Sequence, residues 1–114
     1  MNGLPEDISL EFFVGSKLNQ VCAGEYEIIL HFDRPATLFL ACDIAIDGGD
    51  RVIACAESAP FLLRFLGKRV SHVARIGAGD IKLTFETSGT LSVYDSLPNF
   101  ESYHITLADQ VIVV

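Results

Sequence analysis

The sequence predicts a mainly β domain (α+β at most), built from two three-stranded meanders that pack as a sandwich or partly open barrel with one or two short helices. The chain has 114 residues, which is the length of one ordinary domain. Half of its residues are apolar and 20% are charged, a composition that excludes a disordered chain. Apolar residues also recur in order, with the alternation that is typical of β-strands.

The apolar recurrence forms an internal repeat. Phe13, Gly15, Leu18 and Val21 recur 52 positions later as Phe65, Gly67, Val70 and Val73. Ile28, Leu30, Phe32, Leu38 and Leu40 recur 53 positions later as Ile81, Leu83, Phe85, Leu91 and Val93. One inserted residue in the turn at 77–79 explains the change of offset. We therefore expect a single domain over residues 1–114 with an internal duplication, repeat 1 covering about 9–46 and repeat 2 about 58–107.

Each repeat reads as three consecutive strands. Residues 26–32 and 81–85 alternate between apolar and other side chains, which indicates strands with one apolar face. Turn residues stand on both sides of each strand, at 23–25 and 33–35 in repeat 1 and at 77–80 and 87–89 in repeat 2. The predicted core consists of Leu18, Val21, Ile28, Leu30, Phe32, Leu38, Leu40, Val70, Val73, Ile81, Leu83, Phe85, Leu91 and Val93.

A short helix is expected before the second meander, with Ser58 as its cap and Gly67 after its end. Its apolar residues, at 61, 62, 65 and 66, would share one helical face. The equivalent segment, 9–15, carries a weaker helical pattern and is compatible with an extended chain. Further strands are expected at 51–56, 101–107 and 110–114, and a turn at 47–50.

The net charge of −7 excludes nucleic acid and anionic membranes as the main partner. Residues 1–57 contain ten acidic and three basic residues, whereas residues 58–114 contain five of each. This imbalance suits an acidic face that meets a basic partner. A basic cluster at Arg64, Lys68, Arg69 and Arg75 is compatible with a solvated edge that discourages strand pairing.

The three cysteines indicate a cytoplasmic location. Cys22, Cys42 and Cys55 are an odd number in a chain whose first residues lack the features of a signal peptide, so we expect free thiols in a reducing compartment. Their spacing fits no zinc site.

No metal or cofactor is expected. The glycines at 77–79 precede a strand, whereas a nucleotide-binding loop precedes a helix. The acidic residues at 43, 47 and 50 lack the spacing of a calcium loop. The histidines His31, His72 and His104 fall on three different predicted strands.

The segment 100–105 is the candidate site. Glu101 stands between aromatic residues, where it is either a structural tie or an acid in a pocket. Ser102 and His104 share one face of the predicted strand, but a nucleophile would also need an orienting acid and an oxyanion site, and the sequence does not place Asp95, the candidate acid, beside them. We assign no catalytic residue, and take Glu101, Tyr103 and His104 as candidate ligand-binding residues.

The motifs of repeat 2 resemble a bacterial family of small uncharacterised duplicated β domains. The residues that carry the resemblance are Leu66-Gly67-Lys68-Arg69-Val70, Leu83-Thr84-Phe85, Gly89-Thr90-Leu91-Ser92-Val93 and Phe100-Glu101-Ser102-Tyr103. Tyr103 stands where most members have tryptophan. The family implies no established activity, although some members resemble immunity proteins that bind secreted toxins.

Two functions follow as hypotheses. The acidic excess and the lack of a catalytic constellation favour a non-enzymatic protein-binding module, which by the resemblance would be immunity-like. The alternative is a small-ligand-binding protein or weakly specified enzyme, with a pocket near the candidate residues. We also expect a homodimer, because so apolar a chain has surplus surface to cover; residues 111–114 and the apolar residues of the predicted helix would form the contact.

Overall fold

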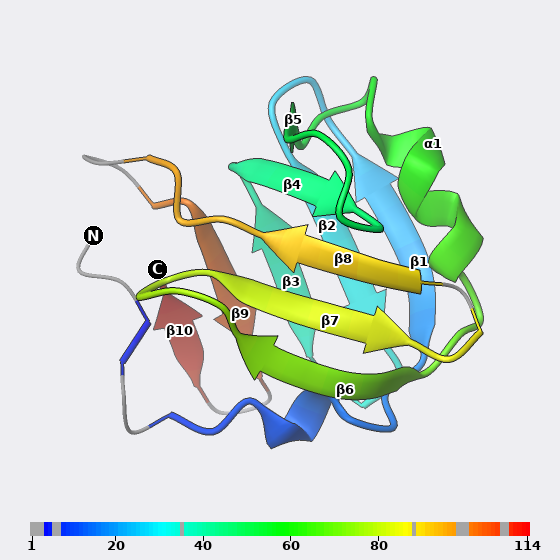
Figure 1. Ribbon diagram of the computed structural model, residues 1–114, viewed down its shortest axis with the longest axis vertical. Helices are drawn as coiled ribbons and strands as arrows, with labels where there is room; N and C mark the ends of the chain where they lie inside the picture. The colour runs from blue at the N-terminus through cyan, green and yellow to red at the C-terminus, as the bar shows by residue number, and fades with distance from the viewer. Residues whose placement is uncertain (1–3, 6–7, 35, 88, 98–100, 108–109) are drawn as a thin grey trace.

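Two antiparallel sheets of five strands form most of the molecule (Figure 1). The computed structural model describes residues 4–5, 8–34, 36–87, 89–97, 101–107 and 110–114. Sheet 1 contains, in spatial order, β1 (Leu18–Ala23), β2 (Ile28–Phe32), β3 (Thr37–Leu40), β9 (Tyr103–Thr106) and β10 (Val111–Val113). Sheet 2 contains β5 (Val52–Ile53), β4 (Asp43–Ile46), β8 (Gly89–Val93), β7 (Ile81–Phe85) and β6 (Val70–Arg75). The prediction of a mainly β fold with two meanders, β1–β2–β3 and β6–β7–β8, is confirmed.

Short helices precede each meander. The 3₁₀ turn η1 (Glu11–Phe13) precedes β1, and α1 (Ala59–Leu62) continues into the 3₁₀ turn η2 (Leu63–Phe65) before β6. Ser58 was expected to cap α1, but its side chain makes no capping hydrogen bond. Its hydroxyl instead donates to the carbonyl oxygen of Ile53 at 2.8 Å and accepts the N–H of Cys55 at 3.1 Å.

Each meander is extended by strands from the other half of the chain. β9 pairs with β3, and β4 pairs with β8, so the fourth strand of each half joins the opposite sheet. The register of the β3–β9 pair matches that of the β8–β4 pair. Leu38 lies opposite Ile105 in sheet 1, and its counterpart Leu91 lies opposite Ile46 in sheet 2. β10 and β5 then pair with β9 and β4 at the sheet edges.

The two sheets meet at one corner, where Lys17 and Arg69 form an antiparallel bridge. Four backbone hydrogen bonds surround this bridge, and each bond has a counterpart 52 residues along the chain. The Gly15 N–H donates to Val70 O as the Gly67 N–H donates to Leu18 O, both at 2.8 Å. The Val70 N–H donates to Ser16 O at 2.9 Å, and the Leu18 N–H donates to Lys68 O at 3.0 Å. Both first strands also carry a bulge at the same place, after Leu18 and after Val70. This local two-fold correspondence supports the internal duplication, which stays a prediction.

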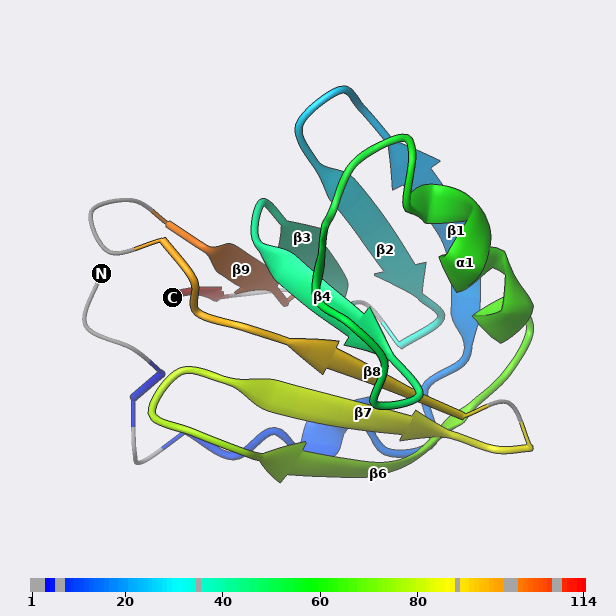
Figure 2. The ribbon, with the colours of Figure 1, turned by 45° about the horizontal axis from the view of Figure 1, so that its top comes forward.

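The two sheets face each other in both ribbon views (Figures 1 and 2), and buried side chains from both sheets form one core. All fourteen predicted core residues pack in it, with Val21 and Val73 only partly buried. The sequence interpretation missed several large members of the core: Phe13, Ile44, Leu62, Phe65, Tyr103 and Ile105. Phe65 stacks on Phe85 with ring centroids 4.4 Å apart, so the turn before β6 closes that end of the core.

Three of the predicted strands are shorter in the structure than expected. The strand expected at 51–56 is only the two-residue β5, and those at 101–107 and 110–114 are β9 and β10. The expected common face of the helix is also wrong, because Leu62 and Phe65 are buried while Phe61 and Leu66 are exposed. At the C-terminus, Ile112 and Val114 are buried inside the chain's own fold.

Some predictions fall outside the described residues. These include the turn residues Pro35 and Ser88 and the first residue of the closing motif, Phe100. Within the described ranges no helix has the length and apolar character needed to cross a bilayer. Cys22, Cys42 and Cys55 are all free thiols.

Candidate functional site

Tyr103 is a buried structural residue. Its side chain is inaccessible to solvent, and its hydroxyl donates to the carbonyl oxygen of Gly79 at 2.7 Å. Burial raises the pKa of the phenol, so the hydroxyl keeps its proton and remains a donor. The contact joins β9 of sheet 1 to the β6–β7 turn of sheet 2, and Tyr103 therefore holds the sheets together.

Glu101 and His104 do come together. The His104 Nδ1 and Glu101 Oε2 atoms are 3.4 Å apart, and the imidazole stacks on the Phe39 ring with centroids 4.6 Å apart. Both side chains lie on the outer side of sheet 1, whereas Tyr103 points into the core because successive residues of a strand face opposite sides. The three candidate residues thus do not share one cavity.

Ser102 does not pair with His104. The side chain is completely buried, and its hydroxyl donates to Asp95 Oδ1 at 2.7 Å while accepting the N–H of Leu97 at 3.1 Å. This arrangement ties Asp95 and Leu97, which follow β8, to the residue before β9. A buried hydroxyl hydrogen-bonded in this way offers no accessible nucleophile.

The other histidines and the acidic turn after β4 form no further site with described residues. The His31 ring lies 3.5 Å from the Thr37 hydroxyl in sheet 1, while His72 is exposed in sheet 2. Asp47 holds the turn after β4, because its carboxylate accepts the Thr90 N–H at 2.9 Å and pairs with Arg64 at 2.9 Å. No cluster of three or more metal-ligating side chains occurs among the residues that the structure describes.

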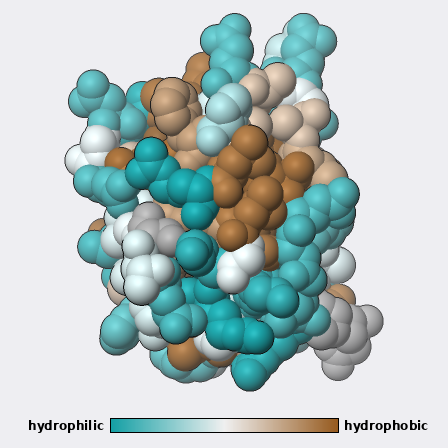
Figure 3. Space-filling view, turned by 90° about the vertical axis from the view of Figure 1, so that its right-hand side faces the viewer, coloured by the Kyte–Doolittle hydropathy of each residue, from teal (hydrophilic) through white to brown (hydrophobic). Residues whose placement is uncertain are grey.

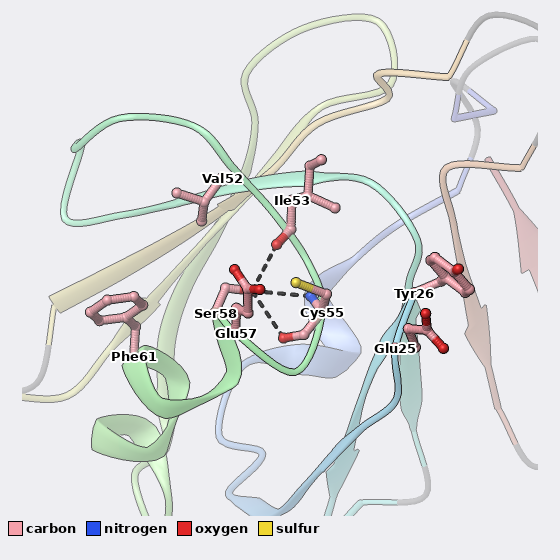
Figure 4. A pocket seen from close by; sticks show the side chains of 8 residues that line it. All are labelled: Glu25, Tyr26, Val52, Ile53, Cys55, Glu57, Ser58 and Phe61. Atoms are coloured by element: carbon pink, nitrogen blue, oxygen red, sulfur yellow. Dashed lines mark hydrogen bonds between the residues drawn. The ribbon is translucent and has the colours of Figure 1, made fainter.

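A hollow of about 530 Å³ lies elsewhere, between the β1–β2 turn, β5 and the start of α1 (Figure 4). Its lining is mostly apolar and aromatic, and it includes two exposed acidic residues. The lining residues are Glu25, Tyr26, Val52, Ile53, Cys55, Glu57, Ser58 and Phe61. Such concave, mainly apolar sites with a few polar groups are typical of binding sites.

The Ser58 side chain fixes the backbone that lines this hollow. Its hydroxyl bonds to Ile53 and Cys55, as the dashed lines in Figure 4 show, and these bonds fold the chain back between β5 and α1. The Ala56 N–H donates to Gly24 O at 2.9 Å, which fixes the same segment to the β1–β2 turn. The walls of the hollow are therefore held by hydrogen bonds to the backbone.

Exposed hydrophobic side chains gather around the hollow. Tyr26, Ile53 and Phe61 are 74%, 66% and 53% exposed. Six of the eight large hydrophobic residues that are exposed in the described chain belong to the β1–β2 turn, β5 or the α1–η2 segment: Tyr26, Val52, Ile53, Phe61, Leu63 and Leu66. Figure 3, which faces the side of the molecule that carries α1, shows a hydrophobic cluster with hydrophilic residues to its left and below it. We call these six residues, with Glu25 and Glu57, the α1 surface.

The carboxylates of the α1 surface are not neutralised by an ion pair in the described part of the chain. Neither Glu25 nor Glu57 forms an ion pair with any described residue. Nearby Arg51 instead lies over the Tyr94 ring, 3.7 Å from its centroid, and Arg64 is paired with Asp47. The α1 surface therefore combines apolar contact area with uncompensated negative charge.

The first half of the chain provides an internal comparison for these side chains. By the 52-residue offset, Phe61 and Leu63 correspond to Ser9 and Glu11, which are also exposed. The two segments also have the same local backbone structure. The Val14 N–H donates to Glu11 O at 3.0 Å, and the Leu66 N–H, 52 residues later, donates to Leu63 O at 3.1 Å. Exposed apolar residues at these positions are therefore not required by the fold.

The sequence interpretation missed the α1 surface as a site. It assigned Phe61 and Leu66 to a self-contact and gave Tyr26 and Ile53 no role outside their strands. A position-by-position comparison of the repeats contains the signal, since polar residues at 9 and 11 stand opposite apolar residues at 61 and 63.

Comparison of the chain with protein-family models, with curated protein sequences and with solved structures found no match. The resemblance stated above therefore remains an expectation, and the functional argument rests on the geometry of the surface.

Proposed function

We propose that the chain is a non-enzymatic protein-binding module that uses the α1 surface to hold a basic segment of its partner. The observation that carries this proposal is the hollow lined by Tyr26, Ile53 and Phe61, together with Glu25 and Glu57, whose carboxylates form no ion pair with a described residue. Large exposed apolar patches with polar rims are typical of protein-interaction sites.

The two parts of the surface suit different groups of the partner. An aromatic or aliphatic side chain would enter the hollow, where Phe61 and Ile53 would bury its surface. Lysine or arginine residues beside it would approach Glu25 and Glu57, which would speed association and fix the orientation of the partner. The partner segment is thus expected to combine one large apolar residue with adjacent basic residues.

The resemblance implies a narrower form of this function, an immunity-like inhibitor whose acidic surface covers a basic site on a toxin. The three free thiols are compatible with the expected cytosolic location. The alternative, a small-ligand site at Glu101, Tyr103 and His104, gains no support from a tyrosine that is buried and hydrogen-bonded.

A display library of short random peptides tests the proposal. The wild-type chain is used for selection, and the double variant Phe61→Ser, Leu63→Glu is used for counter-selection. These substitutions copy the residues found at 9 and 11, so the variant is expected to fold. Selected peptides should contain an aromatic or aliphatic residue next to lysine or arginine.

The affinity of a selected peptide is then measured by fluorescence anisotropy. The variant Glu25→Gln, Glu57→Gln should weaken binding about tenfold, and added salt should reduce the difference. The matched control is Ile76→Ser, because Ile76 is 45% exposed but lies outside the α1 surface. The proposal would be contradicted if counter-selection left no peptide that prefers the wild-type chain over the Phe61→Ser, Leu63→Glu variant, or if the selected peptides lacked basic residues.

A further inference from the structure

The outer face of sheet 1 is a second unusual surface, separate from the α1 surface. Its strand residues point away from the core and are half-buried to exposed. They are, from β1 to β10, Gln20, Cys22, Ile29, His31, Thr37, Phe39, His104, Thr106, Val111 and Val113. None of these ten residues is Asp, Glu, Lys or Arg, although Glu27 and Glu101 stand at its border.

Sheet 2 again serves as the internal comparison. The corresponding registers place Lys82 at the position of Ile29, Thr84 at that of His31 and Ser92 at that of Phe39. Lys82 and Thr84 have the same intermediate exposure as Ile29 and His31. The fold therefore accepts polar and charged residues on this face, and the apolar residues of sheet 1 need another explanation.

We propose that this face packs against the same face of a second copy of the chain, in a two-fold homodimer. A chain with a net charge of −7 repels its own copies, so self-association needs a contact without negative charge at its centre. The outer face of sheet 1 meets this condition. The α1 surface does not, because a two-fold contact there would bring Glu25 and Glu57 of both copies together.

The expected interface is small. Five strands about 4.8 Å apart give a face about 24 Å wide, and two such faces would pack about 10 Å apart. With strands of three to six residues, the total buried area would be near the lower limit of about 1,000 Å² for a specific contact. The dimer should therefore dissociate at micromolar concentrations.

This interface differs from the one expected from the sequence. Val111, which is 59% exposed, and Val113 remain in it, but Ile112 and Val114 belong to the core. Phe61 and Leu66 lie on the α1 surface, outside the proposed contact.

Sedimentation equilibrium from micromolar to near-millimolar concentration tests the proposal. The wild-type mass should rise from 12.4 kDa towards twice that value. The variant Ile29→Lys, Phe39→Ser, which copies Lys82 and Ser92, should remain a monomer throughout. The control variant Phe61→Ser, Leu63→Glu should associate as wild type does.

Circular dichroism checks that each variant is folded. If the double variant is unfolded, Val111→Lys replaces it, because this side chain is exposed on an edge strand and a lysine there cannot disturb the core. A wild-type chain that stays monomeric would overturn the proposal. Association that persists in the folded variant Ile29→Lys, Phe39→Ser or in Val111→Lys would also overturn it. Loss of association in the Phe61→Ser, Leu63→Glu control would overturn it as well, because the contact would then lie on the α1 surface.

Discussion

Lys17 and Arg69 occupy corresponding positions in the two halves of the chain and pair with each other in an antiparallel bridge. A residue that pairs with its own counterpart lies next to the local two-fold axis, here at the corner where the sheets join. The glycines two residues before them, Gly15 and Gly67, both have positive φ values, +86° and +78°. The corner therefore depends on two equivalent turns, which the following experiment compares.

Gly15→Ala and Gly67→Ala should each lower the free energy of unfolding by about 1–2 kcal/mol, because a Cβ atom is strained in the left-handed region. Apart from its chain neighbours, no described residue lies within 4 Å of a Cβ added at Gly67, whereas one at Gly15 would lie 3.2 Å from the Arg34 guanidinium. Gly15→Ala should thus lower the free energy of unfolding by at least as much as Gly67→Ala does. Urea denaturation measures both, and a neutral effect at either glycine would show that its turn relaxes without strain.

Tyr103→Phe should lower the free energy of unfolding by about 1–3 kcal/mol, since it leaves the Gly79 carbonyl without its buried partner. Urea denaturation is again the measurement. Tyr94→Phe is the matched control, because the ring that contacts Arg51 is retained, and this change should have little effect. Equal stabilities of Tyr103→Phe and wild type would mean that water replaces the hydroxyl.

Cys42 should resist thiol reagents in the folded chain. Burial raises the pKa of its thiol to about 12, so the reactive thiolate is scarce near neutral pH. Labelling with an aromatic disulfide reagent should modify Cys22 and Cys55, which are partly exposed, and modify Cys42 only after urea is added. The variant Cys42→Ala identifies the slow thiol. Fast labelling of all three thiols without denaturant would contradict the buried position.

Asp33 should make the fold sensitive to acid. Its carboxylate accepts the Lys17 N–H at 2.8 Å and lies near Arg69, and these contacts lower its pKa below the usual 3.8. The unfolded state then takes up the proton first, so the stabilisation is present above about pH 4 and disappears as the pH falls through the folded pKa. Urea denaturation at pH 6 and pH 3 measures the loss.

Asp33→Asn should reduce that loss of stability between the two pH values. The control is Asp50→Asn, because the Asp50 carboxylate forms no hydrogen bond or ion pair with a described residue. If wild type and Asp33→Asn lose the same stability in acid, other carboxylates dominate the acid response.

The sequence predicted the meanders because their middle strands have a clean period of two, as at Ile81–Phe85. β5 has only two residues, too few to define a period. β4 was missed because Ile44 and Ala45 are both buried, so its two faces do not differ. The pairing of β4 with β8 and of β9 with β3 depends on contacts between distant parts of the chain, which local patterns do not encode.

The candidate site was harder to predict for a geometric reason. A rotation of 100° per residue places residues 61, 62, 65 and 66 on one face, but the chain changes from α1 to a 3₁₀ turn after Leu62. The tighter winding separates Phe61 from Phe65, so one is exposed and the other buried. The buried position of Tyr103 was missed because its hydrogen-bond partner, Gly79, is 24 residues away in sequence.

The exchange of β4 and β9 between the meanders has a consequence for the history of this fold. A half-length chain with this design could not pair its own fourth strand, since that strand belongs to the opposite sheet. Two such chains would have to exchange strands to complete both sheets, which is the arrangement of a domain-swapped dimer. If the repeats arose by gene duplication, their ancestor was an obligate pair of short chains, and fusion made that partnership permanent within one polypeptide.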